Sequence, residues 1–125
     1  MSEGIHHLPR LGIASAMRLY GFTARALRFY EERGLIEARR DRLNSRFYDA
    51  TARGRLEWIS RLRRIGLALS DVEAVLEAGS PQDQAAEALA RVKKRCEVLD
   101  AELTTARLLF DELTGTRPDA RAVSA

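Results

Sequence analysis

The sequence predicts a mainly α-helical chain in which a small head, made of short helices and a hairpin, is followed by one long helix. Three observations support this prediction. Glycines divide the first half into short segments, and an arginine-rich stretch containing an asparagine separates two of them. After Pro81, apolar residues repeat at the spacing of a coiled coil. The chain has 125 residues, 31% of them charged and only 6% aromatic, so we expect a second chain to complete its buried surface.

The first two helices have the spacing of a helix-turn-helix. A helical pattern over residues 13–20 ends at Gly21, and Thr23 is placed to cap a second helix. This second helix is predicted to run to about Arg33, because Gly34 follows. Two short helices joined by Gly-Phe-Thr are typical of this motif.

A hairpin and a third helix are predicted next. Asn44 tolerates a left-handed turn, and Phe47 and Tyr48 favour an extended return strand, so we expect a small wing. Asp49 is then placed to cap a third helix ending near Ile65. The apolar stripe of this helix consists of Leu56, Ile59 and Leu62.

Two more helix starts follow. Residues 70–73, Ser-Asp-Val-Glu, form a capping-box pattern that predicts a fourth helix to Ala78. Ser80 and Pro81 supply the cap and first-turn proline of a fifth helix. From Pro81 to Thr114 this helix would be about 50 Å long.

The fifth helix carries a regular apolar seam. Its members alternate at spacings of three and four residues and are Leu89, Val92, Cys96, Leu99, Leu103, Ala106, Phe110 and Leu113. Such a heptad seam predicts a coiled coil with a second copy of the chain. The alternative is that the helix folds back on its own head, which its length disfavours.

Charge is distributed unevenly along the chain. The net charge is +3, yet residues 10–64 hold 14 arginines and 6 acidic residues, a net of +8. Residues 65–125 hold 7 basic and 11 acidic residues, a net of −4. This polarity is typical of a nucleic-acid-binding part joined to a partner-binding part.

Several functions are disfavoured by composition. One cysteine excludes an internal disulfide and a Cys-x-x-Cys zinc site, and no apolar run approaches the roughly 20 residues of a membrane span. His6 and His7 lack a nucleophile or further metal ligands nearby. We therefore expect a cytoplasmic protein without a signal peptide, enzymatic activity, metal or cofactor.

One stretch carries a recognisable signature. Residues 27–36, Leu-Arg-Phe-Tyr-Glu-Glu-Arg-Gly-Leu-Ile, lie within a pattern that extends without a gap from Ile13 to Val72. This pattern resembles the head of the MerR (mercury-resistance regulator) family of bacterial transcription factors. The long helix after Pro81 is similar to the dimerisation helix of that family. The resemblance also allows the fourth helix to start at Ala68.

The resemblance implies a function and an architecture. It implies a winged helix-turn-helix that places its second helix in the major groove of double-stranded DNA and its wing on the flanking backbone. It further implies an antiparallel coiled-coil homodimer at an inverted repeat, and many members distort an over-long promoter spacer. This role implies RNA polymerase as a partner at the promoter. It also implies that the protein is located at the nucleoid.

The expected domains follow the same plan. Residues 1–11 are a flexible leader, 12–79 the DNA-binding domain, 80–114 the dimerisation helix and 115–125 a flexible tail. The tail is too short for an effector-binding domain, so no small-molecule effector is expected. An alternative is a protein-interaction adaptor that uses a MerR-like head to bind a protein.

The candidate DNA contacts are mostly basic. Those assigned are Thr23, Arg25, Arg28, Tyr30, Arg39, Arg46, Arg61 and Arg63. Arg25 lies in the first turn of the second helix, where an arginine can read guanine, although a merely solubilising role is the alternative. Thr23 and Arg28 are phosphate candidates, and Arg28 could instead pair with a neighbouring glutamate.

Some assignments remain open at this point. Of Phe29 and Tyr30, we choose Tyr30 as the DNA-facing residue because it has a hydroxyl. Arg39 and Arg46 bracket the wing at positions where the family contacts DNA, whereas the arginines between them could simply be solvated. Arg61 and Arg63 are weaker candidates.

The chain departs from the family pattern at a few positions. The wing has Asn44 and Ser45 where the family usually has glycine and an aromatic residue. Arg53 occupies an apolar position of the third helix, which places local packing in doubt. Cys96 lacks the companion cysteines of metal or redox sensors, so we expect it to act as a small apolar side chain.

Overall fold

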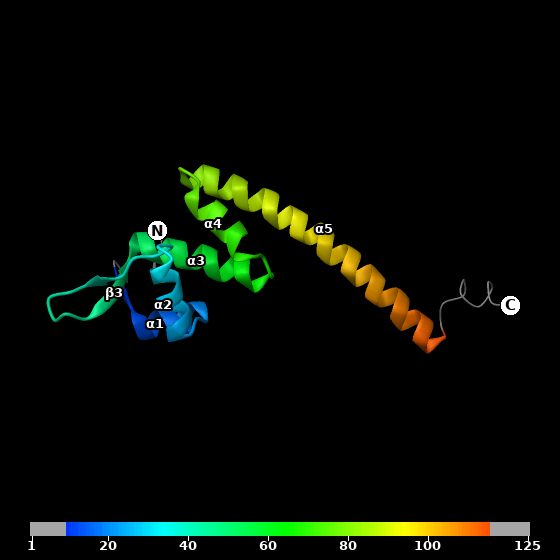
Figure 1. Ribbon diagram of the computed structural model, residues 1–125, viewed down its shortest axis with the longest axis horizontal. Helices are drawn as coiled ribbons and strands as arrows, with labels where there is room; N and C mark the ends of the chain where they lie inside the picture. The colour runs from blue at the N-terminus through cyan, green and yellow to red at the C-terminus, as the bar shows by residue number, and fades with distance from the viewer. Residues whose placement is uncertain (1–9, 116–125) are drawn as a thin grey trace, which may run out of the picture. The chain divides into compact units, whose positions relative to one another are not determined.

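The computed structural model describes residues 10–115 and confirms the mainly helical fold class, with five helices and a small sheet. The chain divides into two compact units, residues 1–88 and 89–125. The first contains the head (Figure 1). The described part of the second is the remainder of the long helix α5 (Pro81–Thr114).

The predicted helix-turn-helix is formed by α1 (Ile13–Tyr20) and α2 (Ala24–Glu32). Gly21 closes α1 at φ 75°, a left-handed conformation that favours glycine, and its N–H donates to the Met17 carbonyl over 2.9 Å. Thr23 caps α2, because its hydroxyl oxygen accepts a hydrogen bond from the Ala26 N–H over 3.0 Å. Two predicted helix ends are therefore confirmed.

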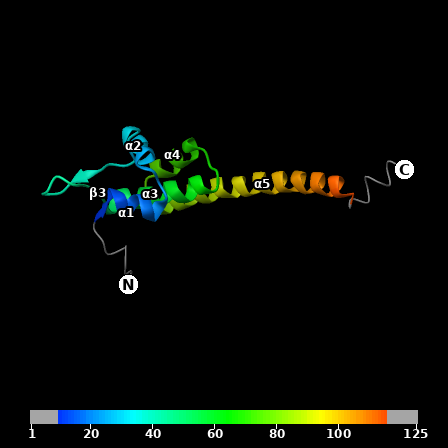
Figure 2. The same cartoon turned by 90° about the horizontal axis from the view of Figure 1, so that it is seen from below.

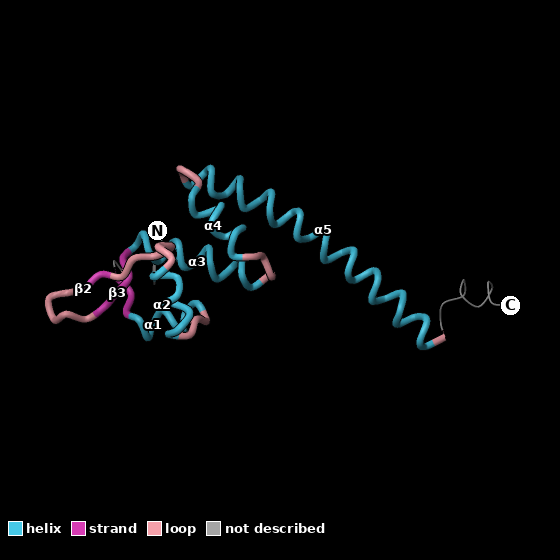
Figure 3. The backbone as a smooth tube through the Cα atoms, viewed as in Figure 1, coloured by secondary structure: helices cyan, strands magenta, loops and turns pink. Residues whose placement is uncertain are grey.

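The head also contains a three-stranded antiparallel sheet. Its strands are β1 (Arg10–Gly12), β2 (Arg39–Arg40) and β3 (Arg46–Asp49), in the order β1-β3-β2. In the register, Leu11 pairs with Tyr48 and Arg39 pairs with Phe47. The wing predicted from Asn44 is thus present, and its strands appear in the tube of Figure 3.

The predicted flexible leader, residues 1–11, extends too far. Arg10 and Leu11 belong to β1, and Leu11 is buried. Residues 10–12 form a strand because β3, almost 40 residues further along the chain, supplies their hydrogen-bonding partners. Residues 1–9 lie outside the described part.

The core of the head is centred on α3 (Ala50–Arg64). Asp49 caps this helix by accepting the Ala52 N–H over 2.9 Å, as predicted. Leu56, Ile59 and Leu62 are buried, which confirms the predicted apolar stripe.

Arg53 is accommodated in this core by a polar contact. Its side chain is buried and hydrogen-bonds with Tyr20 at the end of α1. Burial raises the pKa of the Tyr20 hydroxyl, and the contact with Arg53 opposes that shift. The unusual arginine therefore packs against α1 rather than disrupting α3.

The fourth helix begins earlier than the capping box predicts. Helix α4 (Leu69–Glu77) has Ala68 as its N-cap, without a side-chain hydrogen bond. The N–H groups of Asp71 and Val72 both donate to the Ala68 carbonyl, over 3.0 and 3.2 Å, so Ser70 already lies inside the helix. Leu67, immediately before the N-cap, is buried and fixes the chain there. Of the two predicted starts of this helix, the one at Ala68 is therefore correct.

Helix α5 begins as predicted. The Ser80 hydroxyl accepts the Asp83 N–H over 3.1 Å, and Pro81 is the first helical residue. Gly115 follows its last turn at φ 76°. No helix within residues 10–115 is long and apolar enough to cross a membrane.

Candidate nucleic-acid interface

Helix α2 presents an arginine-rich face to solvent. Arg25 and Arg28 are exposed, and their side chains make no ion pair or hydrogen bond to another described residue. The opposite face is fixed by Leu27, which is buried against the head. The alternative pairing of Arg28 with a neighbouring glutamate is thus not formed, and both guanidinium groups are available to a ligand.

The choice between the two adjacent aromatic residues of α2 was wrong. Tyr30 is only 7% exposed and packs edge-on against Phe22, with ring centroids 5.4 Å apart. Phe29 is 44% exposed, and the Arg33 guanidinium lies 5.7 Å from its ring. The Tyr30 hydroxyl does not decide orientation here, because Phe22 from the preceding turn offers the Tyr30 ring an aromatic partner. Phe29 is the aromatic side chain on the outer face.

Arg46 joins the wing to α2. Its guanidinium donates to the Glu31 carboxylate, which also accepts a hydrogen bond from the Tyr48 hydroxyl. Side chains of Arg46 and Glu31 are 31% and 20% exposed, and Tyr48 is fully buried. The expected DNA contact of Arg46 stays a prediction, and the side chain is held by a residue 15 positions earlier in the chain.

The same cluster perturbs a tyrosine. Burial raises the pKa of the Tyr48 hydroxyl, and its hydrogen bond to the Glu31 carboxylate raises it further. Tyr48 thus remains a protonated donor at neutral pH. The cluster positions the wing relative to α2 through one carboxylate.

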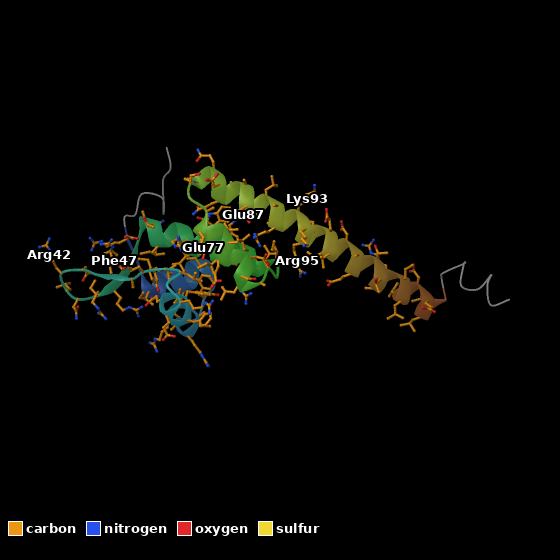
Figure 4. All side chains as sticks on the ribbon, turned by 45° about the horizontal axis from the view of Figure 1, so that its top comes forward. Arg42, Phe47, Glu77, Glu87, Lys93 and Arg95 are labelled. Carbon is orange, nitrogen blue, oxygen red and sulfur yellow. The ribbon has the colours of Figure 1, made fainter. Side chains whose placement is uncertain are left out.

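The wing carries three further arginines with different surroundings. Arg39 is exposed and pairs with Asp49 over 2.9 Å, so the cap of α3 is also tied to β2. Arg40 donates to the Asn44 carbonyl over 2.7 Å. Arg42 is exposed at the outer end of the hairpin, where Figure 4 shows it apart from Phe47.

The two candidate DNA contacts on α3, Arg61 and Arg63, make contacts within the protein. Arg63 donates to the Leu67 carbonyl over 2.9 Å and thereby closes the loop after α3. The Arg61 guanidinium lies 5.8 Å from the Trp58 ring. Both side chains are exposed, but both have intramolecular contacts that α2 arginines lack.

Sequence reasoning did not single out two further arginines that make long-range contacts. Arg33 donates from Nε and Nη2 to one Glu73 oxygen, over 3.1 and 2.7 Å, and so anchors the end of α2 to α4. The Arg10 guanidinium lies 4.5 Å from the Phe47 ring centroid. These contacts join residues that are about 40 positions apart and leave no local signal.

The second unit exposes most of its predicted seam. Leu89, Cys96, Leu103 and Phe110, at alternate seam positions, are all exposed. Val98, Leu108 and Leu109 are exposed too, although they do not belong to the seam. Among residues 10–115, no three His, Cys, Asp or Glu side chains cluster so that they could hold a metal ion.

A helix-turn-helix with an adjacent β wing and outward arginines on its second helix defines a winged helix-turn-helix protein of the DNA-binding class. Residues 12–79 match the family described as MerR HTH family regulatory protein, and residues 53–116 match the family described as MerR, DNA binding. The chain belongs to the MerR family of DNA-binding transcriptional regulators, which is not a family of enzymes.

Two individual proteins illustrate the similarity. The HTH-type transcriptional regulator CueR of Vibrio cholerae serotype O1 is 29% identical over 105 residues, which cover 82% of this chain and 76% of CueR. The same match is found in a second strain. The crystal structure of HiNmlR, described as a MerR family regulator lacking the sensor domain and bound to promoter DNA, has the same fold. Its TM-score is 0.63 at 22% identity, over 93% of this chain and 96% of that one.

Proposed function

We propose that this protein is a homodimeric regulator that binds an inverted repeat in promoter DNA through α2 and the wing. The observation that carries the proposal is the outer face of α2, where Arg25 and Arg28 have no intramolecular partner among the described residues. Buried Leu27 and Tyr30 hold the opposite face rigidly. The binding of HiNmlR to promoter DNA supports the same use of this fold.

Individual roles follow from position on the helix. Arg25 lies in the first turn of α2, from which recognition helices reach base edges, so we assign it to a guanine. Arg28 lies about 60° away around the helix, and we assign it to a backbone phosphate together with the Thr23 hydroxyl. Arg39 is assigned to the flanking phosphates, whereas Arg61 and Arg63 contribute at most long-range attraction.

The homodimer is supported by the exposed seam of α5. Apolar residues at spacings of three and four residues remain accessible from Leu89 to Leu113. Pairing of two such seams would remove them from water, and apolar burial stabilises association by about 25 cal/mol per Å². In this arrangement Cys96 is a small apolar member of the seam. A two-fold dimer in turn reads two half-sites of opposite orientation.

The regulatory step is proposed to act through DNA shape. Two heads held at a fixed separation can change the twist or bend of the base pairs between half-sites, at an energetic cost that depends on sequence. RNA polymerase at the promoter is the partner that would respond to this distortion. The protein would accordingly act at the nucleoid, in the bacterial cytoplasm.

Selection from random double-stranded DNA, followed by footprinting, tests this proposal. We expect the full chain to select an inverted repeat and to protect both half-sites as a dimer. Affinity should fall steeply with salt, because several phosphates are neutralised. Selection of no sequence, or protection of a single half-site by a monomer, would overturn the proposal.

A further inference from the structure

The long helix α5 carries charged residues beside its apolar seam. It runs unbroken from Pro81 to Thr114 (Figures 1 and 2). In the heptad repeat the seam alternates between positions a and d, and positions e and g lie on either side of it. Position a is occupied by Leu89, Cys96, Leu103 and Phe110, and position d by Val92, Leu99, Ala106 and Leu113. Residues at e and g can therefore touch a helix that covers the seam.

Two opposite charges occupy successive g positions. Arg95 is half-exposed, and Glu102, one heptad further on, is exposed. The residues three and four positions from either one include no side chain of opposite charge, so the helix supplies neither with an ion pair at those spacings. Both charges are placed to meet a helix packed against the seam.

An antiparallel partner would bring the g positions of the two helices together. In such a pair each a residue faces a d residue of the partner, so the possible registers differ by one heptad. A side chain on a helix is tilted towards the N-terminus of that helix. Neighbouring g side chains from helices of opposite direction therefore lean towards each other.

We propose that two copies of α5 pair antiparallel in the register that places Cys96 opposite the partner's Leu99, and that an ion pair between Arg95 and the partner's Glu102 selects this register. This inference rests on the homodimer of the proposed function. In this register Arg95 and the partner's Glu102 are offset by only two residues, about 3 Å along the axis. The two-fold axis repeats the contact, so each dimer has two such ion pairs.

Registers displaced by one heptad bring like charges together. If Cys96 faced the partner's Ala106, Glu102 would lie beside the partner's Glu102. If Cys96 faced the partner's Val92, Arg95 would lie beside the partner's Arg95. Juxtaposed like charges oppose association. The two g residues therefore favour one register and disfavour both of its neighbours.

The apolar layers favour the same register. Each layer then combines a larger side chain with a smaller one, which fills the space between the helices evenly. These layers are Leu89 with the partner's Ala106, Leu103 with the partner's Val92, and Leu99 with the partner's Cys96. A displacement that brings Cys96 opposite the partner's Ala106 would put two small side chains in one layer and two leucines in the next.

A parallel pair fits the charges but not the seam. In that arrangement Arg95 would approach the partner's Asp100, and Glu102 the partner's Arg107, and both contacts are favourable. Each seam residue would face its own copy, however, so the layers would range from two phenylalanine rings to two alanines. Such unequal layers leave gaps or overpack. The antiparallel register satisfies both the charges and the packing.

The register has a consequence for DNA binding. A displacement of one heptad moves one helix about 10 Å along the other. Because each α5 follows a DNA-binding head in the chain, this displacement would change the separation of the half-sites that one dimer can reach. The ion pair thus selects a second copy of this chain as the partner and one spacing of the operator.

Charge reversal in the full chain tests this inference. Arg95→Glu puts like charges at both contacts and should raise the dissociation constant of the dimer about tenfold or more, and Glu102→Arg should do the same. The double variant with both substitutions restores the two ion pairs in the reversed sense, so its dissociation constant should return to within about threefold of the parent chain. Sedimentation equilibrium over a range of concentrations measures each constant. As controls, Lys94→Glu and Glu97→Arg reverse charges at heptad positions f and b, away from the seam, and should stay within about threefold of the parent chain.

The other outcomes distinguish this inference from the proposed function. In a parallel dimer the double variant would bring like charges together at both contacts, so a double variant that does not recover would overturn the register. Unchanged association of both single variants, or an equal loss in the controls, would overturn it too. In all these cases the homodimer of the proposed function stands. A parent chain that stays monomeric at every concentration would overturn the homodimer itself, and the register with it.

Discussion

The carboxylate of Glu31, in the last turn of α2, pairs with the guanidinium of Arg46 on β3, and it also accepts the Tyr48 hydroxyl. One acidic side chain thereby fixes the wing to the second helix of the helix-turn-helix. The wing and the helix would have to reach adjacent parts of a DNA duplex together, so their relative position decides whether both fit. This cluster is a structural basis for rigid presentation of the whole surface.

Loss of the Glu31 charge should loosen this connection. Glu31→Gln is expected to lower the free energy of unfolding by about 1–3 kcal/mol, a range reduced from that of a fully buried pair because both side chains are partly exposed. Urea unfolding measures the change. Glu32→Gln removes the same charge from an exposed neighbour and should stay within about 0.5 kcal/mol of the parent chain. Equal effects of the two substitutions would contradict the role of the cluster.

Tyr48 should make the head sensitive to alkali. Its pKa is raised in the folded protein by burial and by Glu31, so above pH 10.0 the unfolded chain releases this proton while the folded chain retains it. The stabilising contribution is complete below pH 10.0 and is lost progressively as the pH rises towards the folded pKa.

Unfolding measurements from pH 8 to 11 check this dependence. Tyr48→Phe should be about 1 kcal/mol less stable near neutral pH, because a hydrogen bond to a carboxylate is lost. It should also show a shallower decline above pH 10.0 than the parent chain. A decline of the same steepness in both proteins would show that Tyr48 does not carry the effect.

The two aromatic residues at the end of α2 should respond in opposite ways. Tyr30→Phe keeps the buried ring and should bind the selected operator within about twofold of the parent chain. Phe29→Ala removes an exposed ring that can contact a thymine methyl group, so we expect binding weakened several-fold. Fluorescence anisotropy with labelled operator distinguishes these results. Weak binding by Tyr30→Phe with normal binding by Phe29→Ala would reverse the assignment.

The seam of α5 offers a matched pair of leucines. Leu103 and Leu108 are similarly exposed, 47% and 42%, but lie about 140° apart around the helix. Leu103→Glu should dissociate the proposed dimer, because a charge would be buried in the coiled coil, whereas Leu108→Glu should not. Sedimentation equilibrium gives the association state directly. If both substitutions, or neither, alter the mass, the seam is not the dimer contact.

Much of the fold could be predicted because its boundaries are local. Three helices are each capped by a side chain that accepts a hydrogen bond from the N–H three residues further on; these side chains are Thr23, Asp49 and Ser80. Gly21 ends a helix in a left-handed conformation. Such signals lie within one turn of the chain. The hairpin followed from Asn44 in the same way.

The contacts that sequence reasoning missed join different elements of the fold. Tyr30 packs against Phe22 in the turn before α2, and Arg46 on β3 pairs with Glu31 on α2; a helical wheel shows neither contact. Leu11 gains its strand from Tyr48, which lies in a different part of the sequence. The arginines of α2 could be assigned to its exposed face from the sequence, because the position of a residue around a helix follows from its number in the chain.

Operator binding by Arg25→Ala is the most direct test of the central claim that α2 reads DNA sequence. Titration of labelled operator should show binding weakened about 5- to 150-fold, with the base preference lost at one position of each half-site. Lys94→Ala removes an equal charge from an exposed position of α5 and should stay within about twofold of the parent chain. Unchanged affinity and unchanged base preference in Arg25→Ala would contradict the account.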